Sequence, residues 1–331
     1  FSCKKDFHEK AMLKKEEDSE ESEQQENTEE TVELPEKLPF TLSEPNVLVL
    51  DHVRYLPMNC PIGEELKDET DTDVLLLDRK LREKYGLVPR GGEMIQPWFA
   101  QKYYPGAEET LERFQLEYRF DSEIDTDVFL AAEYDSLTVN GEEALVTDRY
   151  WVDKCFKIFS AKLKKGENII SVPVDFKQST NLEAVYVLGD FGVQLPNRIV
   201  PIPDKLSPKN IEKQGLPFYS GAVCFYTGVR TGSVTVHVDA LHGADVHLSD
   251  GTQDEIIAFP PYEKSLSLNG ELVVTLECTR RNTFGPHHLV PYPRNAYGPD
   301  AWISEGKSRT EDYVITEQGV EFTVRKKSSF R

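Results

Sequence analysis

An alternation of apolar and polar residues, repeated in many short segments, limits the folds open to this chain more than any other feature. Residues 114–120 read FQLEYRF, with every second side chain apolar. Successive side chains of a β-strand point to opposite faces, so this pattern predicts a strand with one buried face. Segments with strand character follow at 128–139, 155–163, 168–176 and 184–195. Short strands separated by turns predict a sandwich rather than a fold of alternating strands and helices.

Turn residues between these segments favour the same fold. Asn140-Gly141 lies between two apolar runs, and Asn-Gly is the strongest short signal for a β-hairpin. In both halves of the chain a Gly-Glu turn opens a long β-branched strand, at Gly166-Glu167 and at Gly270-Glu271, which indicates an approximate internal duplication. The second series of strand-like segments comprises residues 222–229, 233–238, 244–248, 255–258, 266–268 and 272–278. The sequence therefore predicts an all-β protein with two tandem antiparallel β-sandwiches.

Prolines mark the connection between the two series. They stand at positions 196, 201, 203 and 208, which places a domain boundary there. We predict a first sandwich over residues 39–198 and a second over residues 199–331. Residues 73–86 differ, because their apolar residues recur at helical spacing between a capping Asp73 and a terminating Gly86. They predict the one short helix of the ordered chain.

The N-terminal residues 1–38 have a different composition. From Glu16 to Glu33 the chain holds ten acidic residues and no basic one, and too few apolar residues to offset the entropy of ordering. We predict that residues 1–38 form a disordered, charged linker. The whole chain of 331 residues has a formal net charge of −20. Such a charge repels phosphate backbones and argues against nucleic-acid binding.

Cysteine usage and apolar runs exclude other classes. The five cysteines are scattered and include no Cys-x-x-Cys pair, which argues against a disulfide scaffold and a zinc ribbon. No segment has the roughly 20 apolar residues that a membrane span needs. The chain begins at Phe1-Ser2-Cys3, as expected for a fragment or a processed product, and this start is faintly similar to a bacterial lipoprotein cleavage point. The compartment stays open between the bacterial cytoplasm and the cell surface or exterior.

Three segments of the first half resemble a known family. They are residues 137–142 (LTVNGE), Tyr150-Trp151 and residues 163–169 (LKKGENI). Together they resemble the sugar-binding jelly roll of glycoside hydrolase family 2, a member of the galactose-binding-like sandwiches. The resemblance implies that topology for the first sandwich.

Three further segments resemble the C-terminal part of large bacterial glycosidases that carry this domain. They are residues 42–51, 214–221 and 281–288. Those enzymes have a catalytic barrel elsewhere in their chains, and nothing in this sequence resembles it. The resemblance therefore implies a non-catalytic, carbohydrate-binding accessory region of a glycoside hydrolase acting on polysaccharide, with an upstream catalytic domain of the same chain as partner. An autonomous lectin-like surface module and a structural spacer without a ligand remain alternatives.

Candidate sugar-binding residues are loop aromatics and planar cations. Sugar rings stack on exposed aromatic faces, and Arg offers a rigid fork of donors to hydroxyl groups. The candidates are Trp98, Tyr103, Tyr104, Trp151, His287, His288, Tyr292 and Arg294. Packing in a core is the alternative for each aromatic, and contact with a neighbouring domain is the alternative for the 280–294 loop.

No catalytic residue and no metal ligand is predicted. Glu133 and Asp135 can share a strand face, but a chain with 58 acidic residues shows many such pairs by chance. His237, His242 and His247 are spaced five apart, which places successive side chains on opposite faces of a strand. No cofactor is expected, although the oxygen-rich loop 121–127 is of a kind that holds structural calcium.

Overall fold

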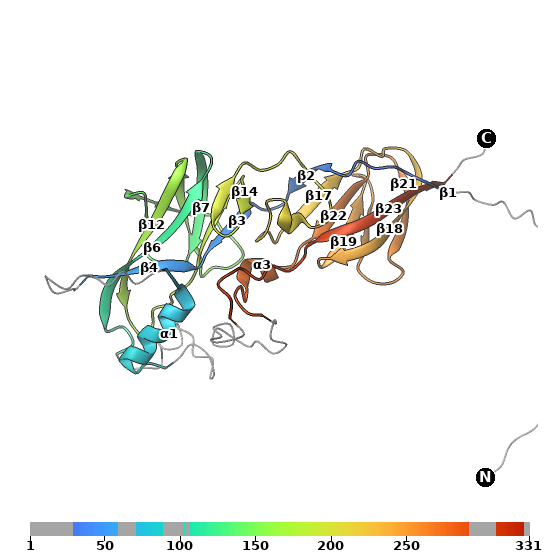
Figure 1. Ribbon diagram of the computed structural model, residues 1–331. Helices are drawn as coiled ribbons and strands as arrows, with labels where there is room; N and C mark the ends of the chain where they lie inside the picture. Colours follow the sequence, from blue (N-terminus) through green and yellow to red (C-terminus); the bar gives the residue numbers. More distant parts are fainter. Residues whose placement is uncertain (1–28, 59–70, 89–101, 103–105, 291–308, 328–331) are drawn as a thin grey trace, which may run out of the picture.

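The computed structural model describes residues 29–58, 71–88, 102, 106–290 and 309–327, and Figure 1 shows them as two packed units. The described chain is all-β, as predicted, and consists of two β-sandwiches made mostly of antiparallel strands. Each sandwich encloses its own apolar core. No helix in the described ranges is long and apolar enough to cross a membrane.

The first sandwich packs a five-stranded sheet against an eight-stranded one. The five-stranded sheet has the order β10 (Leu145–Thr147), β11 (Lys157–Leu163), β7 (Thr126–Ala132), β13 (Val185–Gly189), β3 (Asn46–Leu50). The other sheet has the order β14 (Gly192–Gln194), β15 (Arg198–Val200), β6 (Glu112–Ser122), β12 (Gly166–Phe176), β8 (Thr138–Val139), β9 (Glu142–Glu143), and β4 (His52–Pro57) pairs with β6 and with β5 (Thr72–Asp73).

The second sandwich packs a four-stranded sheet against a six-stranded one. The four-stranded sheet has the order β1 (Glu29–Thr31), β23 (Gly319–Lys327), β18 (Gly232–His242), β21 (Glu263–Leu268). The six-stranded sheet has the order β16 (Lys205–Leu206), β2 (Leu38–Leu42), β17 (Ala222–Tyr226), β22 (Val273–Glu277), β19 (Asp245–Ser249), β20 (Asp254–Ile257).

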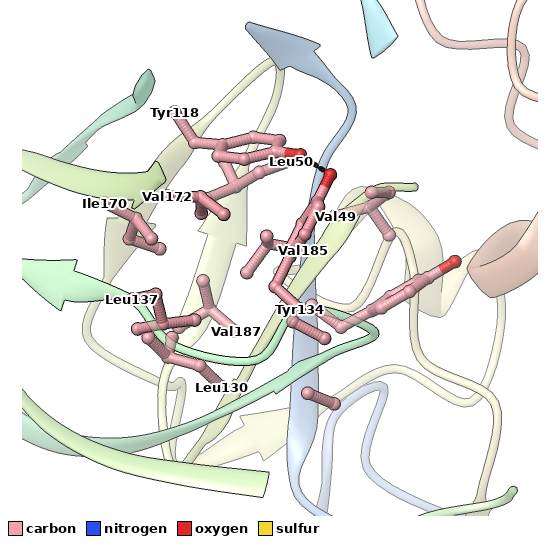
Figure 2. Close-up of a cluster of buried hydrophobic side chains, with 14 of the residues drawn as sticks. Val49, Leu50, Tyr118, Leu130, Tyr134, Leu137, Ile170, Val172, Val185 and Val187 are labelled. Atoms are coloured by element: carbon pink, nitrogen blue, oxygen red, sulfur yellow. Dashed lines mark hydrogen bonds between the residues drawn. The ribbon is translucent and has the colours of Figure 1, made fainter. Parts of the chain in front are cut away.

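The alternating apolar and polar residues of β6 are alternately buried and partly exposed, as side chains on the two faces of a strand are. Phe114, Leu116 and Tyr118 are fully buried, whereas the residues between them are partly exposed. Figure 2 shows Tyr118 and Tyr134 inside this core, with their hydroxyl groups 2.7 Å apart. Both hydroxyl groups also lie 2.8 Å from the carbonyl oxygen of Glu183. The buried hydroxyl groups are thus hydrogen-bonded, which removes the cost of burying them without partners.

The predicted helix and hairpin are present. α1 (Val74–Tyr85) begins after Asp73, whose carboxylate accepts hydrogen bonds from the N–H groups of Leu75 and Leu76. It ends at Gly86, whose φ of 62° is the left-handed conformation that glycine adopts without strain. Asn140-Gly141 forms the tight turn between β8 and β9. The structure adds a short 3-10 helix, η1 (Ile211–Lys213), and a short helix, α3 (Arg281–Phe284).

Strand pairing divides the chain differently from the predicted boundaries. β1 pairs with β23, and β2 lies between β16 and β17, so both N-terminal strands belong to the second sandwich. Residues 29–31 and Leu38 of the predicted linker 1–38 therefore belong to strands, and its residues 1–28 lie outside the described residues. β15 still pairs with β6, so the chain returns to the second sandwich between Val200 and Lys205. The first sandwich is thus inserted between two strands of the second, because β2 completes a sheet that later strands build.

Candidate functional site

Polar side chains from both sandwiches meet at a buried carboxylate between them. Asp51 directly follows β3, and His52 is the first residue of β4, so the turn between two sheets of the first sandwich presents both. His287 and His288 follow α3, and Tyr313 lies before β23, on segments that lead out of and back into the second sandwich. Asp51 and His288 are 237 positions apart in sequence.

The carboxylate of Asp51 is the centre of this cluster. Its Oδ1 lies 2.8 Å from His52 Nδ1 and accepts a hydrogen bond of 2.7 Å from the hydroxyl group of Tyr313. Its Oδ2 lies 3.0 Å from His288 Nε2 and 3.6 Å from His287 Nδ1. The side chain of Asp51 is 8% exposed. We call Asp51, His52, His287, His288 and Tyr313 the junction cluster.

The second nitrogen of each imidazole also faces an oxygen atom. His52 Nε2 lies 3.5 Å from Glu311 Oε2. His287 Nε2 lies 3.0 Å from the carbonyl oxygen of Asn282. His288 Nδ1 lies 3.3 Å from the carbonyl oxygen of Asp312. All three rings are therefore held at both ends, which fixes their orientation toward Asp51.

Burial and hydrogen bonding shift the acidities of the junction cluster. Burial alone would raise the pKa of Asp51, but interactions with His287, His288 and His52 outweigh it and hold this pKa well below its usual range. Burial would lower the pKa of His52, but the neighbouring Asp51 raises it overall. Burial, together with the charge of Asp51, raises the pKa of Tyr313 well above its usual range. Asp51 is therefore ionised at neutral pH, and Tyr313 remains a hydroxyl donor.

A small cavity adjoins the cluster. It has a volume of about 80 Å³ and is lined by residues that include Asp51, Asp73, His287 and His288. Asp73 Oδ2 accepts a hydrogen bond of 3.1 Å from Arg309, while Oδ1 caps α1. Ligand pockets for drug-sized molecules have about 300–1,000 Å³. The cavity can therefore hold an ion or a few water molecules but not a sugar ring.

A larger groove between the sandwiches shares Tyr313 with the junction cluster. It has a volume of about 860 Å³. Its walls come from the β14–β15 hairpin of the first sandwich, from η1 and the residues after it, and from the segment 313–317. The side chains lining it include exposed Gln194, Leu195, Lys213 and Glu317. The groove thus combines amide and charged groups with apolar surface.

The residues predicted from the sequence fall into three places. His287 and His288 lie together in the junction cluster, where the side chain of His288 is 3% exposed. Trp151 is 6% exposed, and its ring packs against Phe156, Tyr186 and Phe284 in the core of the first sandwich. The remaining candidates, Trp98, Tyr103, Tyr104, Tyr292 and Arg294, lie outside the described residues.

Other polar groups considered in the sequence are dispersed. His237 and His242 lie on β18 and His247 lies on β19, and each ring nitrogen is near a different carboxylate. Asp135 pairs with Lys157, and Glu133 accepts a hydrogen bond from Asn181. In the loop 121–127, Asp121 pairs with Arg198 and Asp125 accepts a hydrogen bond from the backbone of Lys165.

Asp51, His52 and Tyr313 were not among the predicted site residues. The available signal in the sequence was the polar pair Asp51-His52, which directly follows an apolar strand. Side chains at the end of a strand lie at the edge of the sheet, where other segments can contact them. Tyr313 carried no signal of its own. Its contact with Asp51 depends on the return of the chain between the two sandwiches.

Comparisons with known proteins give a weak likeness. No family model matches this chain, and no curated protein matches it. A solved structure described as a beta-glycosidase from Bacteroides vulgatus is similar with a TM-score of 0.23 and 10% sequence identity. The likeness covers 70% of this chain and 29% of that protein, so this chain spans less than a third of the length of the protein it matches.

Proposed function

We propose that this chain is a non-catalytic accessory region of a glycoside hydrolase and that it binds an oligosaccharide or polysaccharide in the groove between its two sandwiches. The groove is the observation that carries the proposal. Its volume of about 860 Å³ suits a sugar unit or two, and it draws its walls from both sandwiches. The sequence resemblance to family 2 sugar-binding domains supports the same class of ligand.

The chemistry of the groove suits hydroxyl-rich ligands. Gln194 offers both a donor and an acceptor, Lys213 offers donors, and Glu317 offers acceptors. The exposed side chain of Leu195 and the half-buried Ile315 provide apolar surface for the C–H face of a ring. The carboxylate of Asp51, in contrast, is already contacted by three imidazoles and a phenol of its own chain, which does not suit a catalytic acid or base.

The test is a glycan array with the full chain, followed by calorimetric titration of each sugar that binds. Lys213→Ala and Gln194→Ala are expected to weaken binding about tenfold each, because a hydrogen bond to a charged group contributes about 1.5–3 kcal/mol and a neutral one somewhat less. Lys264→Ala, a lysine on β21 that does not line the groove, serves as the matched control and should bind as the wild type does.

Two results would overturn the proposal. Absence of binding to every glycan would leave the structural-spacer alternative in its place. Cleavage of aryl glycosides by the isolated chain, abolished by substitution of one carboxylate, would show that the region is itself an enzyme.

A further inference from the structure

The imidazoles of the junction cluster have more oxygen neighbours than three neutral rings can satisfy by donating hydrogen bonds. His52, His287 and His288 each have oxygen atoms near both ring nitrogens. A neutral imidazole carries one N–H group and one lone pair, so it can donate to only one of its two neighbours. With three neutral rings, three lone pairs would point at oxygen atoms, and those of His287 and His288 would do so in the buried part of the site.

Protonation of all three imidazoles is the first arrangement that would give every ring nitrogen a partner, and it is costly here. Three imidazolium ions would place three positive charges around one carboxylate. The side chains of His287 and His288 are 9% and 3% exposed, so the charges would be largely removed from water. Like charges at this separation in a medium of low polarity repel each other.

A bound metal ion is the second such arrangement, because it accepts lone pairs from nitrogen and oxygen atoms together. Among the described residues, Asp51, His52 and His288 offer ligand-type atoms that all lie within 4.8 Å of one another. Zinc–ligand bonds of about 2.0–2.2 Å in a tetrahedral site place ligand atoms about 3.4 Å apart. The Asp51 oxygens lie 2.8 Å from His52 Nδ1 and 3.0 Å from His288 Nε2. These are hydrogen-bond separations, which lengthen by about half an ångström when an ion takes the place of the proton.

The surroundings of the three rings also match those of metal ligands. A metal-binding histidine usually donates its other N–H group to a carboxylate or a backbone carbonyl, which orients the ring. Glu311, the carbonyl of Asn282 and the carbonyl of Asp312 occupy these positions for His52, His287 and His288. Tyr313 donates a hydrogen bond to Asp51 in the same way as an outer group orients a ligating carboxylate.

We propose that Asp51, His52 and His288 bind a divalent transition-metal ion of the zinc class at the junction of the two sandwiches. Two imidazoles and a carboxylate are ligands that suit Zn²⁺. Any protons on the ligand nitrogens pass to solvent when the ion binds. The ion joins the end of β3 to the segment after α3, and so holds the inserted sandwich against its host.

The experiment uses the full chain, stripped with a chelator and then dialysed against Zn²⁺. Mass spectrometry of the metal content should find about one zinc ion per chain after dialysis against buffer. Co²⁺ in its place should give the intense visible absorption of a site with few ligands. Thermal unfolding of the stripped protein should shift upward on adding Zn²⁺, because an ion that binds only the folded state stabilises it.

Variants assign the ion to the cluster. The variants His288→Gln and His52→Gln should each lose the bound zinc. The side chain of His52 is partly exposed, so its replacement disturbs the core less. His237→Gln and His247→Gln, which remove imidazoles on β18 and β19, should retain it and serve as matched controls. Tyr313→Phe leaves every ligand in place and is expected to weaken zinc binding about 10- to 100-fold, as for an outer group that orients a ligand.

Several results would overturn the metal site. Wild-type protein that takes up no zinc and whose unfolding temperature does not respond to Zn²⁺ or Co²⁺ would show that the cluster holds protons alone. Zinc uptake that persists in both His52→Gln and His288→Gln would place the ion elsewhere. Neither result bears on the sugar-binding groove, which is tested with glycans, so the two proposals fail separately.

Discussion

At the scale of single residues, Asp250 shows how one carboxylate organises a turn. It follows β19 and accepts hydrogen bonds from the backbone N–H groups of Thr252, Gln253 and Asn269. The bond from Asn269 and those from Thr252 are the main causes that lower the pKa of Asp250. The two sheets of the second sandwich are joined here, because Asn269 follows β21.

Replacing Asp250 should destabilise the protein in a pH-dependent way. The pKa of Asp250 in the folded protein lies below its value near 4 in the unfolded chain. The ionised carboxylate therefore stabilises the fold above about pH 4, and this stabilisation is lost as the pH falls from about 4 toward the folded pKa. Asp250→Asn should therefore lower the unfolding temperature at pH 7, and the gap to wild type should narrow below about pH 4. Thermal unfolding followed by circular dichroism at both pH values checks this, and a gap that is constant with pH would contradict it.

Cys155 is a second residue whose environment sets its chemistry. Burial of the thiol, and after it the charges of Glu133 and Asp153, raise its pKa to about 12, although the residue as a whole is exposed. Only the thiolate reacts with alkylating agents.

We expect the rate at which Cys155 reacts with iodoacetamide at pH 8 to be lower by roughly 100-fold or more than the rate of an ordinary thiol with a pKa near 8.5. Glu133→Gln should accelerate the reaction, and Glu142→Gln, which removes an exposed carboxylate elsewhere, should not. Peptide mapping by mass spectrometry separates Cys155 from the other cysteines. A Cys155 that is labelled as fast as a free thiol would show that the thiol is not held as described.

At the scale of elements, the local signals of the sequence are reliable where the element is defined by its own residues. Asp73 and Gly86 set the two ends of α1 because the capping and left-handed conformations depend on those residues alone. Asn140 and Gly141 both adopt positive φ values, which a two-residue hairpin turn requires. What these signals omit is the partner of each element.

The packing of α1 depends on such a partner. Arg82 lies four positions after Asp78 and pairs with it at 2.8 Å, and both side chains are almost fully buried. The same guanidinium donates hydrogen bonds to the carbonyl groups of Gln178 and Thr180, in the loop after β12. One buried ion pair thus attaches the helix to the first sandwich.

Arg82→Met should lower the free energy of unfolding by about 3–5 kcal/mol, because it removes the cation beside a buried carboxylate. The double variant Asp78→Leu, Arg82→Met should recover part of that loss, since it leaves no buried charge. Arg79→Met, which affects only an exposed pair with Glu83, should change stability by less than about 1 kcal/mol. Denaturant unfolding measures all three; equal losses in the single and double variants would contradict this account.

At the scale of the whole molecule, the second sandwich is discontinuous in sequence. β1 and β2 precede the first sandwich, and β16 to β23 follow it. Glu29 pairs with Lys327, so the two ends of the described chain meet at the far tip of the second sandwich, as Figure 1 shows. β2 lies inside its sheet and contributes buried Leu38 to the core.

A fragment with residues 205–327 alone should therefore fail to unfold cooperatively, because it lacks β2 and leaves β16 and β17 with unpaired edges. Residues 29–43 joined to 205–327 through a short Gly-Ser linker should restore a cooperative transition. Thermal unfolding followed by circular dichroism compares the two. Equal cooperativity in both would show that β1 and β2 are dispensable to the second sandwich.

The sequence by itself determined most of the strands, the Asn-Gly turn and the two ends of α1, because alternation, Asn-Gly and capping residues act within a few positions of each other. The strand segments predicted for the second half, for example, begin and end within a few residues of the bounds of β17 to β22. Only the tertiary structure decided which sandwich β2 completes and that Asp51 meets His288. Backbone pairing and side-chain contact across more than 150 residues leave no local pattern, since any apolar strand can fill an edge until the others are placed.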